Sequence, residues 1–197
     1  MKYYFEKHSE CLPSNANVPS LIQVLYEKKT VLFKQMVNEG SLPPRSGIAR
    51  LVQEARHAGV LLFVCSTSHK ESVQALVRHN FGEEYVAFFT EFLCGDIVPR
   101  KKPAPDIYLL AKDKYKLDPS RCFVVEDSRN GLIAAKEAGM HCIITPSYYT
   151  LTEDFSEADT VVSCLGDPGA EKTALIRGKP PQSQKGFITI EDLDSLL

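Results

Sequence analysis

The stretch RCFVVEDSRNGLIAAKEAGMHCIITP, residues 121–146, decides the fold. Two short apolar runs, RCFVVED (121–127) and HCIITP (141–146), enclose a segment of helical character, NGLIAAKEAG (130–139). Continuous apolar runs of this kind are typical of strands that are covered on both faces, as strands of a parallel sheet are. The stretch therefore predicts a strand, a helix and a second strand.

The same alternation continues on both sides of this stretch. Further apolar runs predict strands at 60–65, 91–98 and, as a last short one, 160–164. Apolar residues with helical spacing predict helices at 48–55, 73–77 and 105–115. Strands that alternate with helices in this way predict a doubly wound, parallel α/β sheet.

The remaining segments give the domain organisation. Residues 1–40 carry helix-spaced apolar residues without a strand signal, and we expect one or two helices there, followed by a turn rich in Pro and Gly. Residues 41–165 form the predicted α/β domain. Residues 166–197 are predicted to be a C-terminal tail: an exposed, mobile connection, then a short strand and a helical turn capped by Asp192 or Thr189.

The composition is that of a globular protein without a charge bias. The 197 residues are 44% hydrophobic and 24% charged, with a net charge of −2. This balance disfavours nucleic acid and anionic membranes as partners, and we expect a monomer. No apolar stretch is long enough to cross a bilayer, and no targeting peptide is visible. The cysteines lack metal-type spacing, which favours small buried side chains in a reducing compartment over disulfides.

Polar residues follow three of the predicted strands. They are the hydroxyl-bearing Ser66–Ser68, then Lys102, and then the adjacent Glu126 and Asp127. Ligands of an open parallel sheet bind just beyond the carboxyl ends of its strands. We therefore expect a hydroxyl, an ammonium group and two carboxylates to converge at one edge of the sheet.

Each of these groups also has a purely structural explanation. Ser66–Ser68 and the Glu126-Asp127 pair could each cap the helix that follows, and Lys102 could lie in a solvated loop. Two adjacent carboxylates at a strand end are costly, however, unless a cation lies between them. Mg²⁺ is held by one or two carboxylates together with water and phosphate oxygens, so the combination predicts a magnesium site beside a phosphate site.

These residues, in this order, resemble a known family. The apolar run ending in Ser66, then KKPAPDIY (101–108), then FVVEDSRNGLIAAKEAGM (123–140) resemble the second, third and fourth motifs of the haloacid dehalogenase superfamily. The resemblance covers about residues 45–165. It is strongest to the branch of β-phosphoglucomutase and the CbbY-like phosphatases, and SYYTLTEDFSEADTVVSCLGDPG (147–169) resembles the plant-type members. It implies a Rossmannoid sheet with the remainder of a helical cap at the N-terminus.

The resemblance also implies a role for each site residue. Ser66 would donate its hydroxyl to the transferring phosphoryl group, and Lys102 would neutralise the charge on that group. Asp127 would ligate Mg²⁺, with Glu126 bound to it directly or through water. Substrate binding would fall to Thr67, Ser68 and His69. The implied enzyme is a phosphatase of the chloroplast stroma that acts on a phosphorylated sugar, xylulose 1,5-bisphosphate.

One family motif is absent from the sequence. It is a strand ending in Asp-x-Asp-Gly, whose first Asp attacks phosphorus and whose second transfers a proton. Here no aspartate precedes Asp96. We therefore expect that the central strand is missing, that the chain is N-terminally incomplete, that Mg²⁺ binds weakly, and that the chain alone is inactive.

Two alternatives to that expectation remain. The first is a non-catalytic remnant that retains the anion site and binds phosphate or a partner. The second is a circular permutation in which Asp192 and Asp194 replace the missing motif. A capped helical turn explains the C-terminal sequence more economically, because no Gly turn and no cap follow it.

Overall fold

The computed structural model describes residue 5 and residues 8–13 and 15–197, which form two compact units, Met1–Pro43 and Pro44–Leu197. The first unit contains a short turn, η1 (Ser9–Cys11), and the long helix α2 (Val18–Asn38).

The N-terminus of α2 is set by local sequence. The side chain of Asn17 accepts a hydrogen bond from the amide of Ser20, and a proline stands in the first turn, where its missing N–H costs nothing.

The second unit contains two separate sheets. In the first, β1 (Phe63–Ser66) and β2 (Glu91–Cys94) pair in parallel. The second has the order β3 (Phe123–Glu126), β4 (His141–Ile144), β5 (Thr160–Val162) and β6 (Leu175–Gly178). The first three strands of this sheet are parallel, and β6 is antiparallel to β5. Within the described part of the chain, no pairing joins β1 to β3.

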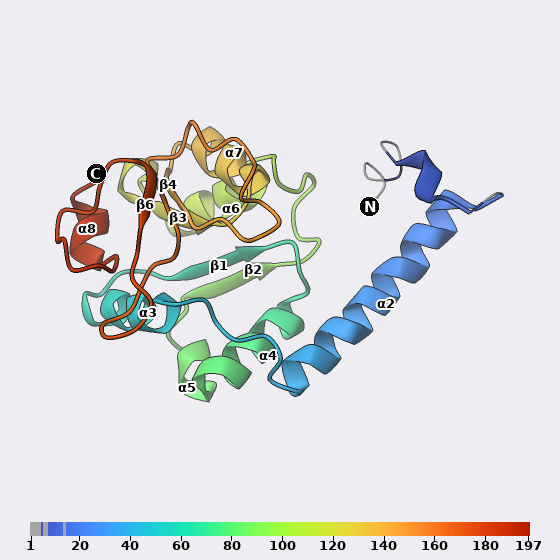
Figure 1. Ribbon diagram of the computed structural model, residues 1–197, viewed down its shortest axis with the longest axis horizontal. Helices are drawn as coiled ribbons and strands as arrows, with labels where there is room; N and C mark the ends of the chain where they lie inside the picture. The colour runs from blue at the N-terminus through green and yellow to red at the C-terminus, as the bar shows by residue number, and fades with distance from the viewer. Residues whose placement is uncertain (1–4, 6–7, 14) are drawn as a thin grey trace. The chain divides into compact units, whose positions relative to one another are not determined.

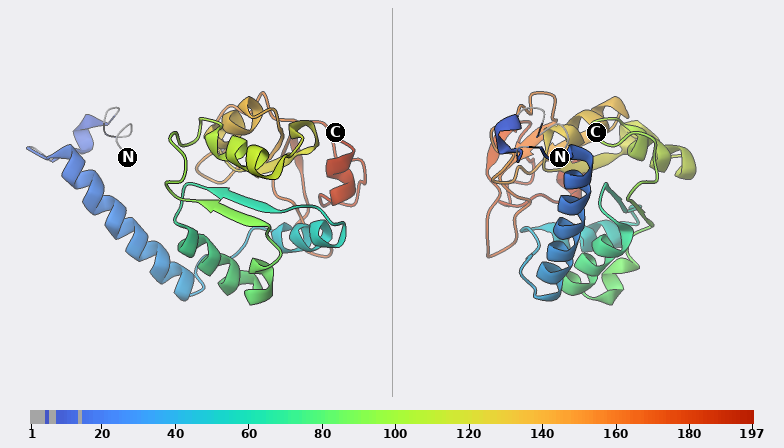
Figure 2. Two further views of the ribbon diagram at one scale, coloured as in Figure 1. Left: turned by 180° about the vertical axis from the view of Figure 1, so that it is seen from behind. Right: turned by 90° about the vertical axis from the view of Figure 1, so that its right-hand side faces the viewer.

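Helices cover both sheets, as a doubly wound fold requires. They are α3 (Ile48–His57), α4 (Lys70–Phe81), α5 (Glu83–Val86), α6 (Asp106–Tyr115), the short turn η2 (Pro119–Arg121), α7 (Arg129–Glu137) and α8 (Ile190–Asp194). On one side of the molecule, α6 and α7 pack together over β1, β3 and β4, whereas α4 packs on β2 (Figures 1 and 2). The remaining face of the larger sheet receives α3 and α8, which contact each other. The α/β class predicted from the sequence is therefore confirmed.

Alternating burial along the strands explains these layers. Cys142 and Ile144 of β4 enter the core beneath α6 and α7, and Ile143 between them enters the core beneath α3 and α8. All three are 0% exposed. Val125 of β3 is the register partner of Ile143, yet it remains 37% exposed. The larger sheet is therefore fully covered at β4 but not at its β3 edge.

Two expectations about the strands are corrected. The run at 60–65 was expected to be a strand covered on both faces, but β1 begins only at Phe63, and Val60 and Leu61 are 46% and 55% exposed. No layer in the described part of this chain covers their apolar side chains. The apolar pattern therefore predicted a strand that begins three residues too early.

The strand at 160–164 was expected to be the last one, but β6 follows it in the segment predicted to be an irregular connection. All four β6 residues are exposed, so the sequence has no burial pattern there from which to predict a strand. Gly178 permits the pairing, since its φ is 87° and a Cβ would lie 2.4 Å from the carbonyl oxygen of Asp159.

Other features agree with the sequence. All six cysteines are free. Thr189 caps α8, and its hydroxyl and the carboxylate of Asp192 form a reciprocal capping box. None of the described helices is both long and apolar enough to span a membrane.

Candidate active site

Lys102 is directed into the protein, unlike its two basic neighbours. Arg100 and Lys101 are 70% and 50% exposed and form surface ion pairs. The side chain of Lys102 is only 13% exposed. Its Nζ donates to the carbonyl oxygen of Cys65 in β1, at 2.9 Å, and to the carboxylate of Glu126 at the end of β3. The explanation of Lys102 as a solvated loop residue is therefore wrong: Lys102 joins the ends of the two sheets.

Glu126 receives a second donor from α6. The phenol of Tyr108 donates to Glu126 Oε1 at 2.5 Å, and Lys102 Nζ lies 4.7 Å from the centre of the Tyr108 ring. Burial, followed by the charge of Glu126, holds the pKa of Tyr108 well above its usual range, so the phenol stays protonated and remains a donor. Sequence reasoning missed Tyr108; the available signal was its place at the end of the KKPAPDIY motif.

Gly131 makes room for the Glu126 carboxylate in the first turn of α7. A Cβ at position 131 would lie 2.1 Å from Glu126 Oε2. Real atoms do not approach so closely, so any larger residue would displace the carboxylate. This contact explains in physical terms the glycine of the Glu-Asp-Ser-x-x-Gly pattern.

Asp127 lies at the exposed end of β3. Its carboxylate makes no hydrogen bond or ion pair with any described residue. The N-cap of α7 is Ser128, whose hydroxyl accepts from the amide of Gly131 at 3.3 Å. The capping explanation of Glu126 and Asp127 is therefore wrong, and Asp127 remains available to a ligand.

The hydroxyls after β1 do not cap the next helix either. Ser66 Oγ accepts from the amide of Ser68 at 3.1 Å, which fixes a tight turn at the strand end. The N-cap of α4 is His69, without a side-chain capping bond. Thr67, Ser68 and His69 are all exposed beside this turn. The structure thus places these residues at the same strand end as Ser66, and no side chain among them caps α4.

The donor chemistry at the strand ends fits a hard cation held mainly by water and phosphate. Glu126 and Asp127 offer carboxylate oxygens, which Mg²⁺ prefers. They do not form a closed protein cage: among the described residues, no group of three or more His, Cys, Asp or Glu side chains is arranged to hold a metal. With Glu126 paired to Lys102, Asp127 is the more accessible of the two carboxylates.

The C-terminal carboxylates lie elsewhere. Asp192 is 2% exposed and accepts hydrogen bonds from Ser183 and from Thr189. Helix α8, which carries both Asp192 and Asp194, packs against α3. Asp192 is thus used in capping its own helix, which removes the structural basis for the permuted arrangement.

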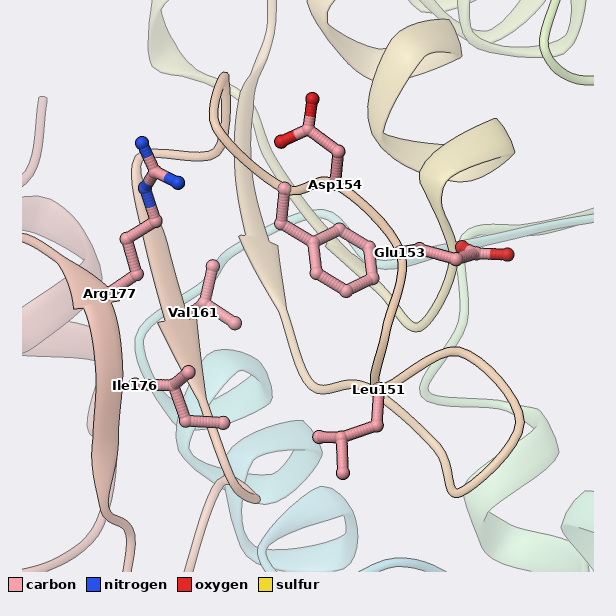
Figure 3. Close-up of a pocket in the computed structure, with 7 residues that line it drawn as sticks. Leu151, Glu153, Asp154, Val161, Ile176 and Arg177 are labelled. Atoms are coloured by element: carbon pink, nitrogen blue, oxygen red, sulfur yellow. The ribbon is translucent and has the colours of Figure 1, made fainter.

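A hollow of about 410 Å³ lies between β6 and the segment that follows β4. Figure 3 shows Leu151, Val161 and Ile176 on its apolar walls and Asp154 and Arg177 near its upper rim. None of the residues predicted from the sequence lines it.

The chain is similar to known proteins. Residues 13–139 match a hydrolase family described as haloacid dehalogenase-like hydrolase. The chain is 46% identical over 178 residues to a CBBY-like protein of Arabidopsis thaliana, a match that covers 89% of this chain and 56% of that protein. It is 40% identical over 151 residues to the protein CbbY of Cereibacter sphaeroides, with 77% and 66% covered.

A solved structure agrees with these relatives. It is a mutant form of CbbY from Rhodobacter sphaeroides in complex with xylulose-(1,5)bisphosphate. It is 37% identical, with a TM-score of 0.72, and the match covers 85% of this chain and 72% of the other. The chain thus spans 56% and 66% of the length of the two curated relatives above.

Proposed function

This chain belongs to the haloacid dehalogenase-like hydrolases, and from that premise we propose that it carries the phosphate- and magnesium-binding half of a sugar-bisphosphate phosphatase. The observation that carries the proposal is the bridge made by Lys102. A partly buried ammonium group joins the ends of β1 and β3 at the sheet edge where ligands of parallel sheets bind.

The substrate class follows from the relatives. A CbbY structure holds xylulose-(1,5)bisphosphate, and we propose a bisphosphate of a small sugar for this chain as well. Ser66 would donate a hydroxyl to the reacting phosphoryl group, and Thr67, Ser68 and His69 would contact the second phosphate. Phosphoryl transfer depends mainly on positioning and charge stabilisation, which is what these side chains supply.

Magnesium would be held by Asp127, with Glu126 beside it, and would neutralise phosphate charge when bound. Lys102 has two partners in this scheme. Its ammonium group pairs with the Glu126 carboxylate in the free protein, and in the complex it would also neutralise charge on the phosphoryl oxygens. Tyr108, which stays protonated, keeps a hydrogen bond on Glu126 when Lys102 is engaged.

In this proposal the nucleophile is not supplied by the given 197 residues. Family chemistry attacks phosphorus with an aspartate, and no aspartate precedes Asp96. The proposal is therefore that the chain of 197 residues binds phosphate without turning it over, and that turnover needs a further strand between β1 and β3. Support comes from the split sheet and from the partly exposed Val125.

Phosphate binding by the chain as it stands tests the proposal. Titration with inorganic phosphate, followed by NMR, should perturb the amides of Ser66, Thr67 and Asp127. Lys102→Ala should abolish the effect, because it removes the positive charge at the strand ends. Lys101→Ala is the matched control, since its charge lies in a surface pair. Unchanged phosphate binding by Lys102→Ala would reject the assignment.

A non-catalytic role is the second candidate. It is supported by the lack of any aspartate before Asp96, and it predicts phosphate binding without hydrolysis even when a strand ending in Asp-x-Asp-Gly is supplied. As to location, the plant relative supports a plastid as the proposed compartment.

A further inference from the structure

Asp127 must be fixed through its backbone, because its carboxylate has no partner among the described residues. The segment that does so is residues 147–157, here called the strap, which runs from the end of β4 past the Asp127–Arg129 turn.

The hydroxyl of Thr150 makes the first hydrogen bond between the strap and the Asp127–Arg129 turn. It donates to the carbonyl oxygen of Asp127 and accepts from the amide of Ser147 at 2.9 Å. A hydroxyl has a single proton, and the carbonyl oxygen of Asp127 is the nearest acceptor for it: the hydroxyl and the carbonyl oxygen of Ser147 lie farther away, at 3.1 and 3.4 Å. The turn from Ser147 to Thr150 thus holds the same hydroxyl that donates to Asp127.

Glu153 makes the second hydrogen bond between the strap and this turn. Its carboxylate accepts from the amide of Arg129 at 2.6 Å, in the first turn of α7. A negative charge at a helix N-terminus strengthens such a bond. The guanidinium of Arg129 returns the interaction, since it donates to the carbonyl oxygen of Asp154 and pairs with Glu157 at 3.2 Å. Strap and turn therefore hold each other through both backbone and side chains.

Little else fixes the middle of the strap. The segment is anchored near its start, where Arg45 donates to the carbonyl oxygen of Pro146 at 3.0 Å, and within it by the buried Phe155. Between these anchors its other flank borders the open hollow, where Leu151 is 59% exposed (Figure 3). The polar ties to Asp127 and Arg129 therefore determine where the middle of the strap lies.

We propose that Thr150 and Glu153 are positioning residues for Asp127. They hold the carbonyl of Asp127 and the amide of Arg129, so that the Asp127 carboxylate projects at the end of β3 toward a divalent cation. The inference rests on the proposed role of Asp127 as a magnesium ligand. In this proposal Thr150 acts through the backbone of Asp127 and not as a ligand itself.

The test uses the full chain and Mn²⁺ as a paramagnetic substitute for Mg²⁺. Mn²⁺ affinity is measured by electron paramagnetic resonance, and hydrogen exchange is followed at the Arg129 amide. Thr150→Val removes the hydroxyl at constant size and should weaken Mn²⁺ binding about threefold to tenfold, the range of one net hydrogen bond. Thr150→Ser retains the hydroxyl and should bind Mn²⁺ with the parental affinity. Glu153→Ala should speed exchange of the Arg129 amide.

Two controls separate this effect from general damage. Thr152→Val makes the same chemical change at an exposed strap residue that forms no hydrogen bond with the described residues, and it should leave the affinity unchanged. Urea unfolding of every variant shows whether the fold is intact. Because Thr150→Ser and Thr150→Val differ in the hydroxyl, equal weakening in both would overturn the proposal.

The outcome for Asp127→Asn distinguishes this inference from the proposed function. If Asp127→Asn loses Mn²⁺ while Thr150→Val binds it as the parent does, the positioning role is wrong and the metal site stands. If Asp127→Asn binds Mn²⁺ as the parent does, Asp127 is not a ligand, and both proposals are wrong.

Discussion

At the scale of single residues, the site depends on one mostly buried carboxylate with two donors. Glu126 is held by Lys102 and Tyr108 and lies against Gly131. Removing one partner of a buried ion pair typically costs about 3–5 kcal/mol, because it leaves the other charge uncompensated. Lys102 is thus a structural residue as well as a candidate catalytic one, and tests of its role must separate binding from stability.

Gly131→Ala tests this packing. Alanine in a helix interior is favoured over glycine by about 1 kcal/mol, so in an open position the change would stabilise α7. Here the new Cβ would push Glu126 away from Lys102 and Tyr108, and overpacking typically costs about 1–3 kcal/mol in addition to the weakened pair. We expect a lower melting temperature by circular dichroism. Asn130→Ala, in the same turn but exposed, is the matched control and should not destabilise. Equal stability of the two variants would contradict the packing argument.

At the scale of elements, capping explains how short segments take defined positions. Helix α8 has only five residues, yet Thr189 and Asp192 form a capping box at its start, and Leu193 and Leu196 enter the core beside Leu51 of α3. Local hydrogen bonds and one apolar face together fix the C-terminus, although the segment preceding it carries little hydrophobic signal.

The pH dependence of α8 follows from Asp192. Burial raises the pKa of this carboxyl, but hydrogen bonds from Ser183 and Thr189 outweigh burial, and the net shift is downward. A carboxyl with a lowered pKa in the folded state stabilises the protein above the unfolded value of about 3.9, and that stabilisation is lost as the pH falls through the folded pKa.

Asp192→Asn should therefore be less stable than the parent at pH 7, and the difference should shrink as the pH falls below about 4, where the parent loses this contribution. Urea midpoints at about pH 7, 4 and 3 measure it. Asp194→Asn is the control, because its exposed side chain makes no hydrogen bond with the described residues and should follow the parent. A constant difference at all three pH values would show that Asp192 titrates alike in both states.

At the scale of the whole second unit, the sheet is divided. Strand β1 pairs with β2 and β3 pairs with β4, while Lys102 crosses between the two sheets only at the strand ends. Unpaired backbone groups along strand edges favour association with other chains. Val60, Leu61 and Val125 remain partly uncovered near these edges. A strand that pairs with both β1 and β3 would satisfy the backbone and cover the apolar side chains together.

Supplying that strand should raise stability and activity together. A longer form that includes a strand ending in Asp-x-Asp-Gly should melt at a higher temperature and release phosphate from sugar bisphosphates in a magnesium-dependent reaction. Lys102→Ala in that form should lower turnover by roughly a hundredfold, typical of a group that stabilises transition-state charge. Turnover by the present chain, lost in Asp194→Asn, would contradict this reading and restore the permuted one.

The sequence by itself determined the α/β class, the residues that end the strands and, apart from the short elements α5 and η2, the order of strands and helices from Ile48 to Val162, because periodicity and strand-end chemistry are local properties. Only the tertiary structure decided the rest. Tyr108 reaches Glu126 because α6 packs on β1 and against α7, and β6 pairs through its backbone although all of its residues are exposed. The ties from Thr150 and Glu153 to the Asp127–Arg129 turn join residues more than twenty positions apart. Such contacts arise from the packing of distant segments, which no local pattern in the sequence encodes.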